Sequence, residues 1–473
     1  MRFRLFLALI GSALLGSTLI GCSGAASSSS QPAAAAVPAA PGEPAAQARR
    51  VGGTRRTQSV PTCTGSGTAS FIGGGASNVA FGADSGVLAG VGNEACDQST
   101  VIAGGNSNTI APSSGNPVTN GFIGGGESNA ITVYTDGFIG AGRSNSVTAP
   151  RAAIVAGTGN GVAATDAIVA SGESNTISVD GTLGFIGDGS GNSVSSLYGV
   201  VMNGNNNNVS GEYGVIGSGI NNTVSGEGGY IASGGYNTVS GTGAVIVGGF
   251  NSTAGGTFAT VPGGYVNSAG GTYSFAAGAR ASAANTGAFV WSDGSDGDAI
   301  LTSSRNYQFL ARAAGGFTLW TNAASTVGAT LAPGSGTWAS ASDRNLKTDV
   351  AGIDDGAVLD KVASLPISRW SYKSERGVSH VGPMAQDFYA AFKLGADDKH
   401  ITSIDEDGVA LAAIKALHAE NRSVRAENRS MRAENVQLRA RLTTVEASHS
   451  AQIADLKREL ARLSETVATL HRN

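Results

Sequence analysis

One serine and one lysine in the C-terminal part of the chain have the side-chain types of a nucleophile and its base. Ser342 and Lys347 lie five residues apart. A serine hydroxyl is a poor nucleophile until a base removes its proton. A lysine amine acts as that base only where burial lowers its pKa from about 10.4 towards neutrality. The pair is therefore a candidate nucleophile and base, provided that assembly buries the lysine, although the spacing alone does not favour catalysis. The alternative is that Ser342 caps a turn and Lys347 is a surface charge.

The same segment marks a sharp change of composition along the 473-residue chain. Residues 1–341 contain no lysine and no histidine, whereas lysines occur from Lys347 onward and histidines from His380 onward. We interpret this break as a domain boundary. Charged residues make up only 14% of the chain, and the net charge is −4. Because no basic stripe crosses the region before the break, we expect no nucleic-acid partner.

The N-terminus has the pattern of an export signal, predicted for residues 1–21. Arg2 and Arg4 precede an apolar run that ends at Ile20. This run is shorter than the roughly 20 residues of a membrane-spanning helix, so a removable signal is favoured.

The signal ends in Leu19-Ile20-Gly21-Cys22, which resembles a bacterial lipobox. The resemblance implies cleavage before Cys22 and attachment to a membrane through lipid on Cys22. An Ala/Ser/Pro-rich tether over residues 22–62 fits this interpretation, and Ser23 is compatible with the outer membrane. The alternative is an ordinary signal peptide that contains a cysteine.

Two further cysteines, Cys63 and Cys96, complete the total of three. In an exported protein such a pair is predicted to form one structural disulfide. Their separation fits neither a redox motif nor a zinc pattern. We therefore expect no metal and no cofactor.

Residues 63–285 consist of a repeated unit of about 15 residues, rich in the chain's 71 glycines. Each unit has two apolar residues, a Gly-rich stretch, an asparagine and a second short apolar segment. The pattern predicts a β-solenoid with two short strands per coil, with Ile, Val and Phe inward and Gly and Asn at the corners. Single coils cannot bury their apolar side, so coils must stack. Because the core is thin, we expect trimerisation to supply much of the burial. The asparagines followed through the repeats are Asn78, Asn93, Asn108, Asn129, Asn145, Asn160, Asn175, Asn192, Asn207, Asn222, Asn237, Asn251 and Asn267.

These repeats resemble the heads of trimeric autotransporter adhesins, which are β-rolls. The chain departs from that family because it has a predicted lipid anchor and no C-terminal membrane barrel. Adhesion to a glycan or host surface is therefore an analogy, and the ligand is left open.

Residues 286–341 form a predicted β-rich connector in which aromatic residues return, among them Trp291, Trp320 and Trp338. We interpret it as structural coupling between the repeats and the C-terminal part. The alternative is an aromatic platform for sugars.

The C-terminal module, predicted as a small α+β domain over residues 342–412, carries several motifs in order. They resemble the intramolecular chaperone at the end of endosialidase tail spikes and other phage fibres. The motifs are Ser342-Asp343-Arg344-Asn345-Leu346-Lys347, Ile367-Ser368-Arg369-Trp370-Ser371-Tyr372, His380-Val381-Gly382-Pro383-Met384-Ala385-Gln386-Asp387-Phe388 and Asp405-Glu406-Asp407-Gly408-Val409-Ala410-Leu411.

That family assembles three chains, drives folding of the preceding β-fibre and then cuts itself off. The resemblance implies that Ser342 is the nucleophile, that Lys347 is the general base and that the cut falls between Ala341 and Ser342. A Ser-His-Asp triad with His380 and Asp387 is the weaker alternative, because the sequence has no nucleophile elbow.

Residues 413–473 are predicted to form a coiled coil, because apolar residues recur at alternating spacings of three and four. The repeated Arg-Ala-Glu-Asn places Asn421, Asn428 and Asn435 at successive a positions. Asparagines buried at a positions fix the register of a coiled coil and favour dimers. The prediction of a trimer therefore depends on the family resemblance. Export and mixed charges argue against a DNA-binding basic zipper.

Together these observations predict a mainly β, exported, lipid-anchored homotrimeric fibre whose C-terminal chaperone acts once as a serine peptidase on its own chain. The alternative is a surface adhesin or structural fibre in which the C-terminal domain trimerises without cutting.

Overall fold

The computed structural model describes residues 67–112, 118–133 and 135–471. The predicted signal, Cys22, the tether and Cys63 lie outside these residues. The chain divides into two compact units, Met1–Arg312 and Ala313–Asn473, which are described separately.

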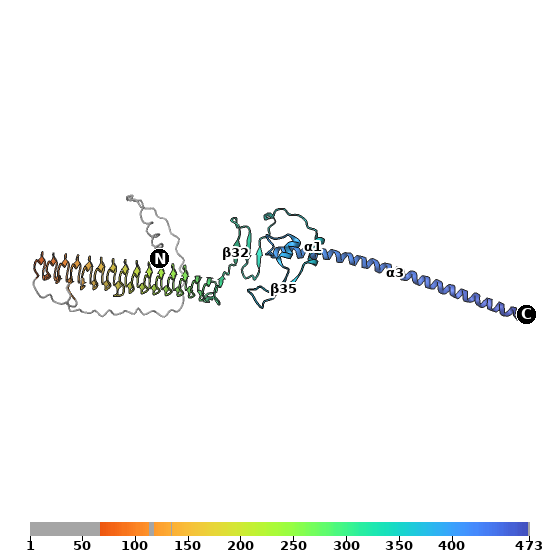
Figure 1. Cartoon of the computed structure of the whole chain (residues 1–473), viewed down its shortest axis with the longest axis horizontal. Helices are drawn as coiled ribbons and strands as arrows, with labels where there is room; N and C mark the ends of the chain where they lie inside the picture. The colour runs from red at the N-terminus through yellow and green to blue at the C-terminus, as the bar shows by residue number, and fades with distance from the viewer. Residues whose placement is uncertain (1–66, 113–117, 134, 472–473) are drawn as a thin grey trace, which may run out of the picture. The chain divides into compact units, whose positions relative to one another are not determined.

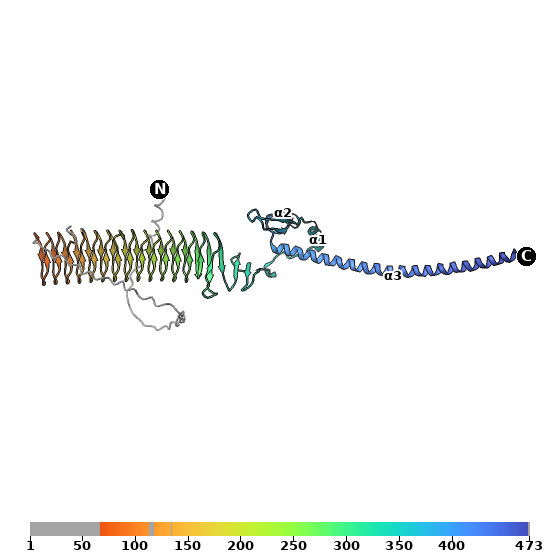
Figure 2. The same ribbon diagram turned by 90° about the horizontal axis from the view of Figure 1, so that it is seen from below.

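The first unit is a parallel β-solenoid, which confirms the predicted fold (Figure 1). Successive strands along the chain belong alternately to a 16-stranded and a 15-stranded sheet. Pairing is in register from coil to coil, so that Val200 pairs with Val215 and Val215 with Tyr230. A row of single-residue parallel bridges forms a third contact between coils. The stacked rungs are seen side-on in Figure 2.

The odd-numbered strands build the larger sheet. They are β1 (Phe71–Ile72), β3 (Gly86–Val87), β5 (Val101–Ile102), β7 (Phe122–Ile123), β9 (Phe138–Ile139), β11 (Ala153–Ile154), β13 (Ile168–Val169), β15 (Phe185–Ile186), β17 (Val200–Val201), β19 (Val215–Ile216), β21 (Tyr230–Ile231), β23 (Val245–Ile246), β25 (Thr260–Val261), β27 (Phe275–Ala279), β29 (Phe289–Asp293) and β31 (Phe309–Arg312).

The even-numbered strands build the second sheet. They are β2 (Val79–Ala80), β4 (Glu94–Ala95), β6 (Thr109–Ile110), β8 (Ala130–Ile131), β10 (Ser146–Val147), β12 (Gly161–Val162), β14 (Thr176–Ile177), β16 (Ser193–Val194), β18 (Asn208–Val209), β20 (Thr223–Val224), β22 (Thr238–Val239), β24 (Thr253–Ala254), β26 (Ser268–Ala269), β28 (Ala281–Ala283) and β30 (Leu301–Thr302).

The core of the solenoid comes from the second residue of nearly every two-residue strand. Ile154, Ile186 and Ile216 in one sheet and Ile177 and Val209 in the other are fully buried within one chain. Stacking of coils alone therefore closes this core within one chain, and the expectation that trimerisation supplies further burial stays a prediction. The phenylalanines differ from the prediction: they occupy the first strand position and face outward.

A ladder of buried asparagines runs through the repeats. Asn175 donates its backbone N–H and side-chain Nδ2 to Asn160 Oδ1 at 3.0 and 3.2 Å. Its Nδ2 also donates to the carbonyl of Gly189 at 2.9 Å, and its own Oδ1 accepts two bonds from Asn192. Buried polar groups must be satisfied in this way to avoid a large desolvation cost.

The ladder asparagines therefore are not the corner residues that the sequence predicted, whereas the neighbouring Asn206 and Asn221 are, with φ of 53° and 54°. The left-handed backbone lies just before the ladder asparagines, for example at Ser174 with φ 56°.

In one coil the chain shifts the expected position by a residue: Asn251 has φ 55°, and Ser252 takes the ladder position. When Ser252 is counted as the ladder residue between Asn237 and Asn267, both intervals have the usual repeat length.

Both sheets continue beyond residue 285, where the connector was predicted to begin. Strands β29 to β31 extend them to Arg312. Phe289 stacks on Phe275 at a ring distance of 4.6 Å, and Phe309 stacks on Phe289 at 4.8 Å, in the same outward column. The rest of the predicted connector is an antiparallel three-stranded sheet of β32 (Phe317–Trp320), β33 (Gly328–Leu331) and β34 (Trp338–Ser340).

The second unit continues with short elements and one long helix (Figure 1). Helix α3 begins well before the predicted coiled-coil boundary at residue 413. Thr402 caps it, since its Oγ1 accepts a hydrogen bond from the Asp405 N–H. The elements are η1 (Arg344–Leu346), α1 (Asp355–Ser364), β35 (Ser368–Trp370), β36 (His380–Gly382), α2 (Ala385–Phe392) and α3 (Ser403–Leu470).

The small core of the second unit lies where α1 and α2 meet the start of α3. Phe388 of α2 is 3% exposed, and Val409, Ala412 and Ala416 of α3 are also buried. Beyond these turns α3 runs exposed to Leu470. In the part of the chain that the structure describes, no helix has the length and apolarity to cross a membrane.

Candidate cleavage site

The predicted scissile bond lies directly after the last strand of the antiparallel sheet. β34 ends at Ser340, and the N–H of Ala341 donates to the carbonyl of Gly328 at 3.1 Å. Ala341 is thus held at the sheet edge, and Ser342 is the first residue beyond it. Gly328 cannot be replaced freely, since an added Cβ would lie 2.0 Å from the Leu319 carbonyl oxygen.

A single turn of 3₁₀-helix lies between the predicted nucleophile and the predicted base. Asp343 caps η1, because its Oδ1 accepts hydrogen bonds from the backbone and side-chain nitrogens of Asn345 at 2.9 and 3.1 Å. Lys347 follows the turn directly, and its N–H donates to the Arg344 carbonyl at 3.1 Å. The turn therefore folds the segment back on itself.

This turn brings the two predicted site residues together. Lys347 Nζ donates a hydrogen bond to Ser342 Oγ at 2.7 Å, which is within the range for nucleophile and base. Both side chains are exposed in the single chain. To act as a base, the amine must be neutral, so that its lone pair can accept the proton of the hydroxyl. Burial of the pair favours the neutral amine.

The two residues of the alternative triad, His380 and Asp387, lie in the β35–β36 hairpin and in α2. The His380 ring stacks on Trp370 at 4.7 Å, and its Nε2 lies 3.5 Å from a carboxylate oxygen of Glu375. Asp387 lies in the first turn of α2. The structure thus gives His380 a packing role in the β35–β36 hairpin.

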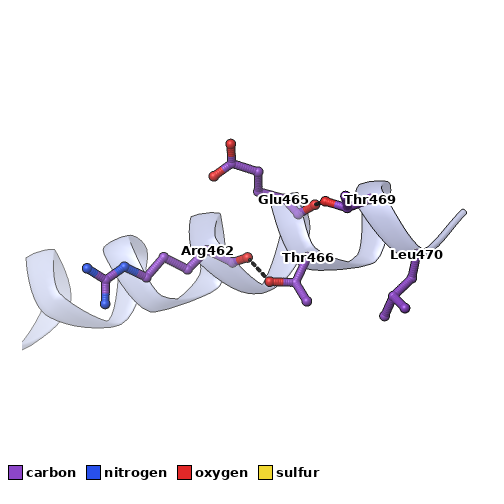
Figure 3. A pocket seen from close by; sticks show the side chains of 5 residues that line it. All are labelled: Arg462, Glu465, Thr466, Thr469 and Leu470. Carbon is purple, nitrogen blue, oxygen red and sulfur yellow. Dashed lines mark hydrogen bonds between the residues drawn. The ribbon is translucent and has the colours of Figure 1, made fainter. Parts of the chain in front are cut away.

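Two of the hollows in the second unit lie near the two ends of α3. One, of about 390 Å³, is lined by Trp370, Tyr372, Val381, Met384 and Glu406 among others and lies between the hairpin and the starts of α2 and α3. The other lies on the exposed surface near the end of α3, beside Arg462, Thr466 and Leu470 (Figure 3). The threonine hydroxyls there donate to carbonyls of their own helix, as at Thr466 to Arg462, so they are already satisfied (Figure 3).

The remaining predicted sites are only partly within the described residues. Cys96 is disulfide-bonded, while Cys63 lies outside them, so their pairing stays a prediction. Among residues 67–112, 118–133 and 135–471, no cluster of three or more His, Cys, Asp or Glu side chains has a metal-binding arrangement.

The fold and the serine–lysine pair define a β-solenoid protein with a separate α+β module and a long C-terminal helix. Residues 342–394 match the family model described as chaperone of endosialidase. The match confirms the family resemblance for the module and supports a chaperone role of the C-terminal part in tail-fibre folding. It begins at Ser342 and includes Lys347. A comparison with curated proteins finds no match.

Two residues of the site were missed by sequence reasoning. Asp343 caps the turn that returns Lys347 to Ser342, and Gly328 anchors Ala341. An aspartate followed by a short turn is a local signal for a cap. No local signal links Gly328 to Ala341, because their contact depends on strand register.

Proposed function

We propose that this chain is an exported, lipid-anchored fibre whose C-terminal chaperone assembles three copies and then cuts the chain between Ala341 and Ser342. The observation that carries the proposal is the 2.7 Å contact between Lys347 Nζ and Ser342 Oγ at the first residues of the family match. Localisation to the outer membrane and lipidation at Cys22 rest on the sequence pattern alone.

The exposed apolar positions of α3 support assembly. Leu417, Val424, Met431 and Leu438 recur every seven residues and are 49–60% exposed in the single chain. The intervening Asn428 donates only to the carbonyl of Val424 in its own helix, at 2.9 Å. A single helix with such a seam is stabilised when it packs against other copies.

The charges beside this seam specify a parallel arrangement in register. In each of four successive heptads, the g residue and the e residue five positions later have opposite charges. Parallel helices in register place these residues of neighbouring copies together. In the part of α3 that the structure describes, no ion pair joins them within one chain. The four pairs are Glu420 with Arg425, Glu427 with Arg432, Glu434 with Arg439 and Arg441 with Glu446.

Assembly would couple folding to cutting. The single chain leaves the side chains of Ser342 and Lys347 exposed to solvent. Neighbouring copies that cover the pair would favour the neutral amine by desolvation. Cutting would then follow correct assembly and release the chaperone from a finished fibre.

The proposed reaction balances as follows. Lys347 takes the proton from Ser342 Oγ, which adds to the carbonyl carbon of Ala341. The bond from that carbon to the Ser342 nitrogen breaks, and the nitrogen takes the proton back, which leaves an ester between Ala341 and the serine oxygen. Water then hydrolyses the ester to the carboxylate of Ala341 and the free hydroxyl of Ser342.

A non-cleaving fibre is the second candidate, and the exposure of the pair in the single chain favours it. Both candidates are separated by comparing the wild-type chain with Ser342→Ala and with the matched control Ser340→Ala on denaturing gels. The proposal expects two fragments from wild type and Ser340→Ala and a full-length chain from Ser342→Ala. A full-length wild-type chain would leave the non-cleaving fibre as the function.

A further inference from the structure

We infer that copies of the solenoid pack against one another through the outer face of the 16-stranded sheet. This odd-strand face consists of the first residue of each odd-numbered strand and the residue two positions later. The inference rests on the proposed assembly of several copies, and it adds the surface by which the fibre part itself associates.

The odd-strand face is mostly apolar, with hydroxyl groups at Tyr230 and Thr260. Neither of its two residue columns contains a charged or amide side chain between Phe71 and Ala311. Large members remain substantially exposed in the single chain: Phe138 is 38%, Ile168 40%, Val155 49% and Met202 53% exposed. Contiguous apolar surface on this scale marks an interaction site in soluble proteins.

The outer face of the other sheet has the opposite character. Its first strand positions are mostly short polar residues, such as Thr176, Asn208, Thr223, Thr238 and Ser268. Both faces belong to the same coils, have the same spacing and back onto the same core. The repeat therefore does not require an apolar outer face, and the difference between the two sheets needs its own cause.

Side-chain volumes on the odd-strand face compensate in several coils, although Phe289 is followed by Trp291. Phe122, Phe138 and Phe185 are each followed two positions later by glycine, and an added Cβ at those glycines would lie 3.4–3.5 Å from the phenylalanine ring. In contrast, Gly86 is followed by Leu88 and Ala153 by Val155.

All three glycines also allow close coil stacking, since an added Cβ would lie 2.3 Å from a carbonyl oxygen of the next coil. Leu88 and Val155 show, however, that the position accepts large side chains. The result of the compensation is a level surface. A solvent-exposed surface does not need to be level, whereas close packing against a partner requires a surface of matching shape.

Another copy of this chain is the partner that fits the face best. The partner surface must be uncharged, level and as long as the solenoid, and the odd-strand face of a second copy has these properties. The charge pattern of α3 specifies parallel copies in register, which brings equivalent faces to the same height. After the proposed cut the solenoid no longer has α3, so the product needs a surface of its own to stay assembled.

Cysteine labelling in the assembled chain tests the inference. Val247→Cys places a thiol on the odd-strand face at a site that is 50% exposed in the single chain, and Thr253→Cys places one on the exposed opposite face of the same coil. Each is made in the full-length Ser342→Ala chain, which keeps its chaperone. Maleimide modification at each site is followed by peptide mass spectrometry, with the denatured chain as reference and light scattering for the oligomeric state. A short bismaleimide tests cross-linking between copies.

The inference expects an oligomer in which Val247→Cys reacts at least about tenfold more slowly than Thr253→Cys and alone cross-links copies. An oligomer in which both sites react equally, or in which Thr253→Cys is the protected site, would overturn the inference and leave the proposed function intact. A monomer in light scattering would remove the assembly step of the proposed function and the inference with it.

Discussion

Lys347 Nζ lies 2.7 Å from Ser342 Oγ, and the one-turn helix capped by Asp343 holds the two residues in this relationship. The contact is local, since the two residues lie five positions apart. Its chemistry depends on the surroundings, because the same pair is inert as an exposed ammonium and hydroxyl and reactive once the amine is neutral. Assembly is the event that changes these surroundings.

The role of Lys347 as a base is tested by Lys347→Arg. Arginine keeps the positive charge and the donor but does not lose its proton in proteins. We expect cutting to slow by at least about a hundredfold, which is the usual contribution of a general base. The measurement is the fraction of cut chain over time on gels. Lys373→Arg, an exposed lysine elsewhere in the module, should cut at the wild-type rate. Normal cutting by Lys347→Arg would show that Lys347 is not the base.

The asparagine ladder predicts a stability difference between two adjacent residues. Asn175→Ala removes bonds to Asn160, Gly189 and Asn192 and leaves their partners unsatisfied. We expect the free energy of unfolding to fall by about 1–3 kcal/mol or more. Thr176→Ala, on the outer face of the next position, should have a much smaller effect. Chemical denaturation followed by circular dichroism measures both, and equal losses would contradict a structural role of the ladder.

The break in the ladder at Ser252 predicts a stabilising substitution. Ser252 keeps the backbone bond to Asn237 Oδ1 at 3.0 Å, and its hydroxyl accepts from the Asn267 N–H at 3.2 Å. Ser252→Asn should restore the side-chain amide bonds to both neighbouring coils and raise the melting temperature. Asn207→Ser makes the reverse change in an intact part of the ladder and should lower it. A lower melting temperature for Ser252→Asn would show that this coil has adapted to serine.

The charges along α3 predict a reversible change in association. Glu427→Arg places two like charges together between parallel copies and should weaken association by up to about 1 kcal/mol per contact. Glu427→Arg combined with Arg432→Glu restores opposite charges and should recover the wild-type oligomer. Light scattering of the Ser342→Ala chain over a dilution series measures the effect. A double variant as weak as the single one would argue against the parallel register.

The sequence was sufficient for features that depend on period and local spacing. The repeat near Asn160 and Asn175 predicted stacked coils, and the five-residue spacing of Ser342 and Lys347 predicted a contact that one turn can form. The sequence was insufficient where the same residue type fits both an inward and an outward position. Outward Phe122 obeys the same alternation as an inward one, and Asn251 resembles a ladder residue although Ser252 occupies that position.

The end of the solenoid was also hidden in the sequence. Strands β29 to β31 extend the same sheets after the glycine-rich pattern has faded, because stacking of Phe289 and Phe309 replaces it. Contacts set by strand register, such as Ala341 with Gly328, depend on the folded sheet.

The most direct test of the central claim is the rate at which the Ser342 N-terminus appears when the denatured wild-type chain refolds at different concentrations. Intact-mass analysis identifies the fragment, and its yield over time gives the rate. If assembly buries the pair of Ser342 and Lys347, the fragment begins at Ser342 and forms faster, in proportion, at higher chain concentration. A chain that stays full length, a fragment with another N-terminus, or a rate that does not depend on concentration would contradict the claim.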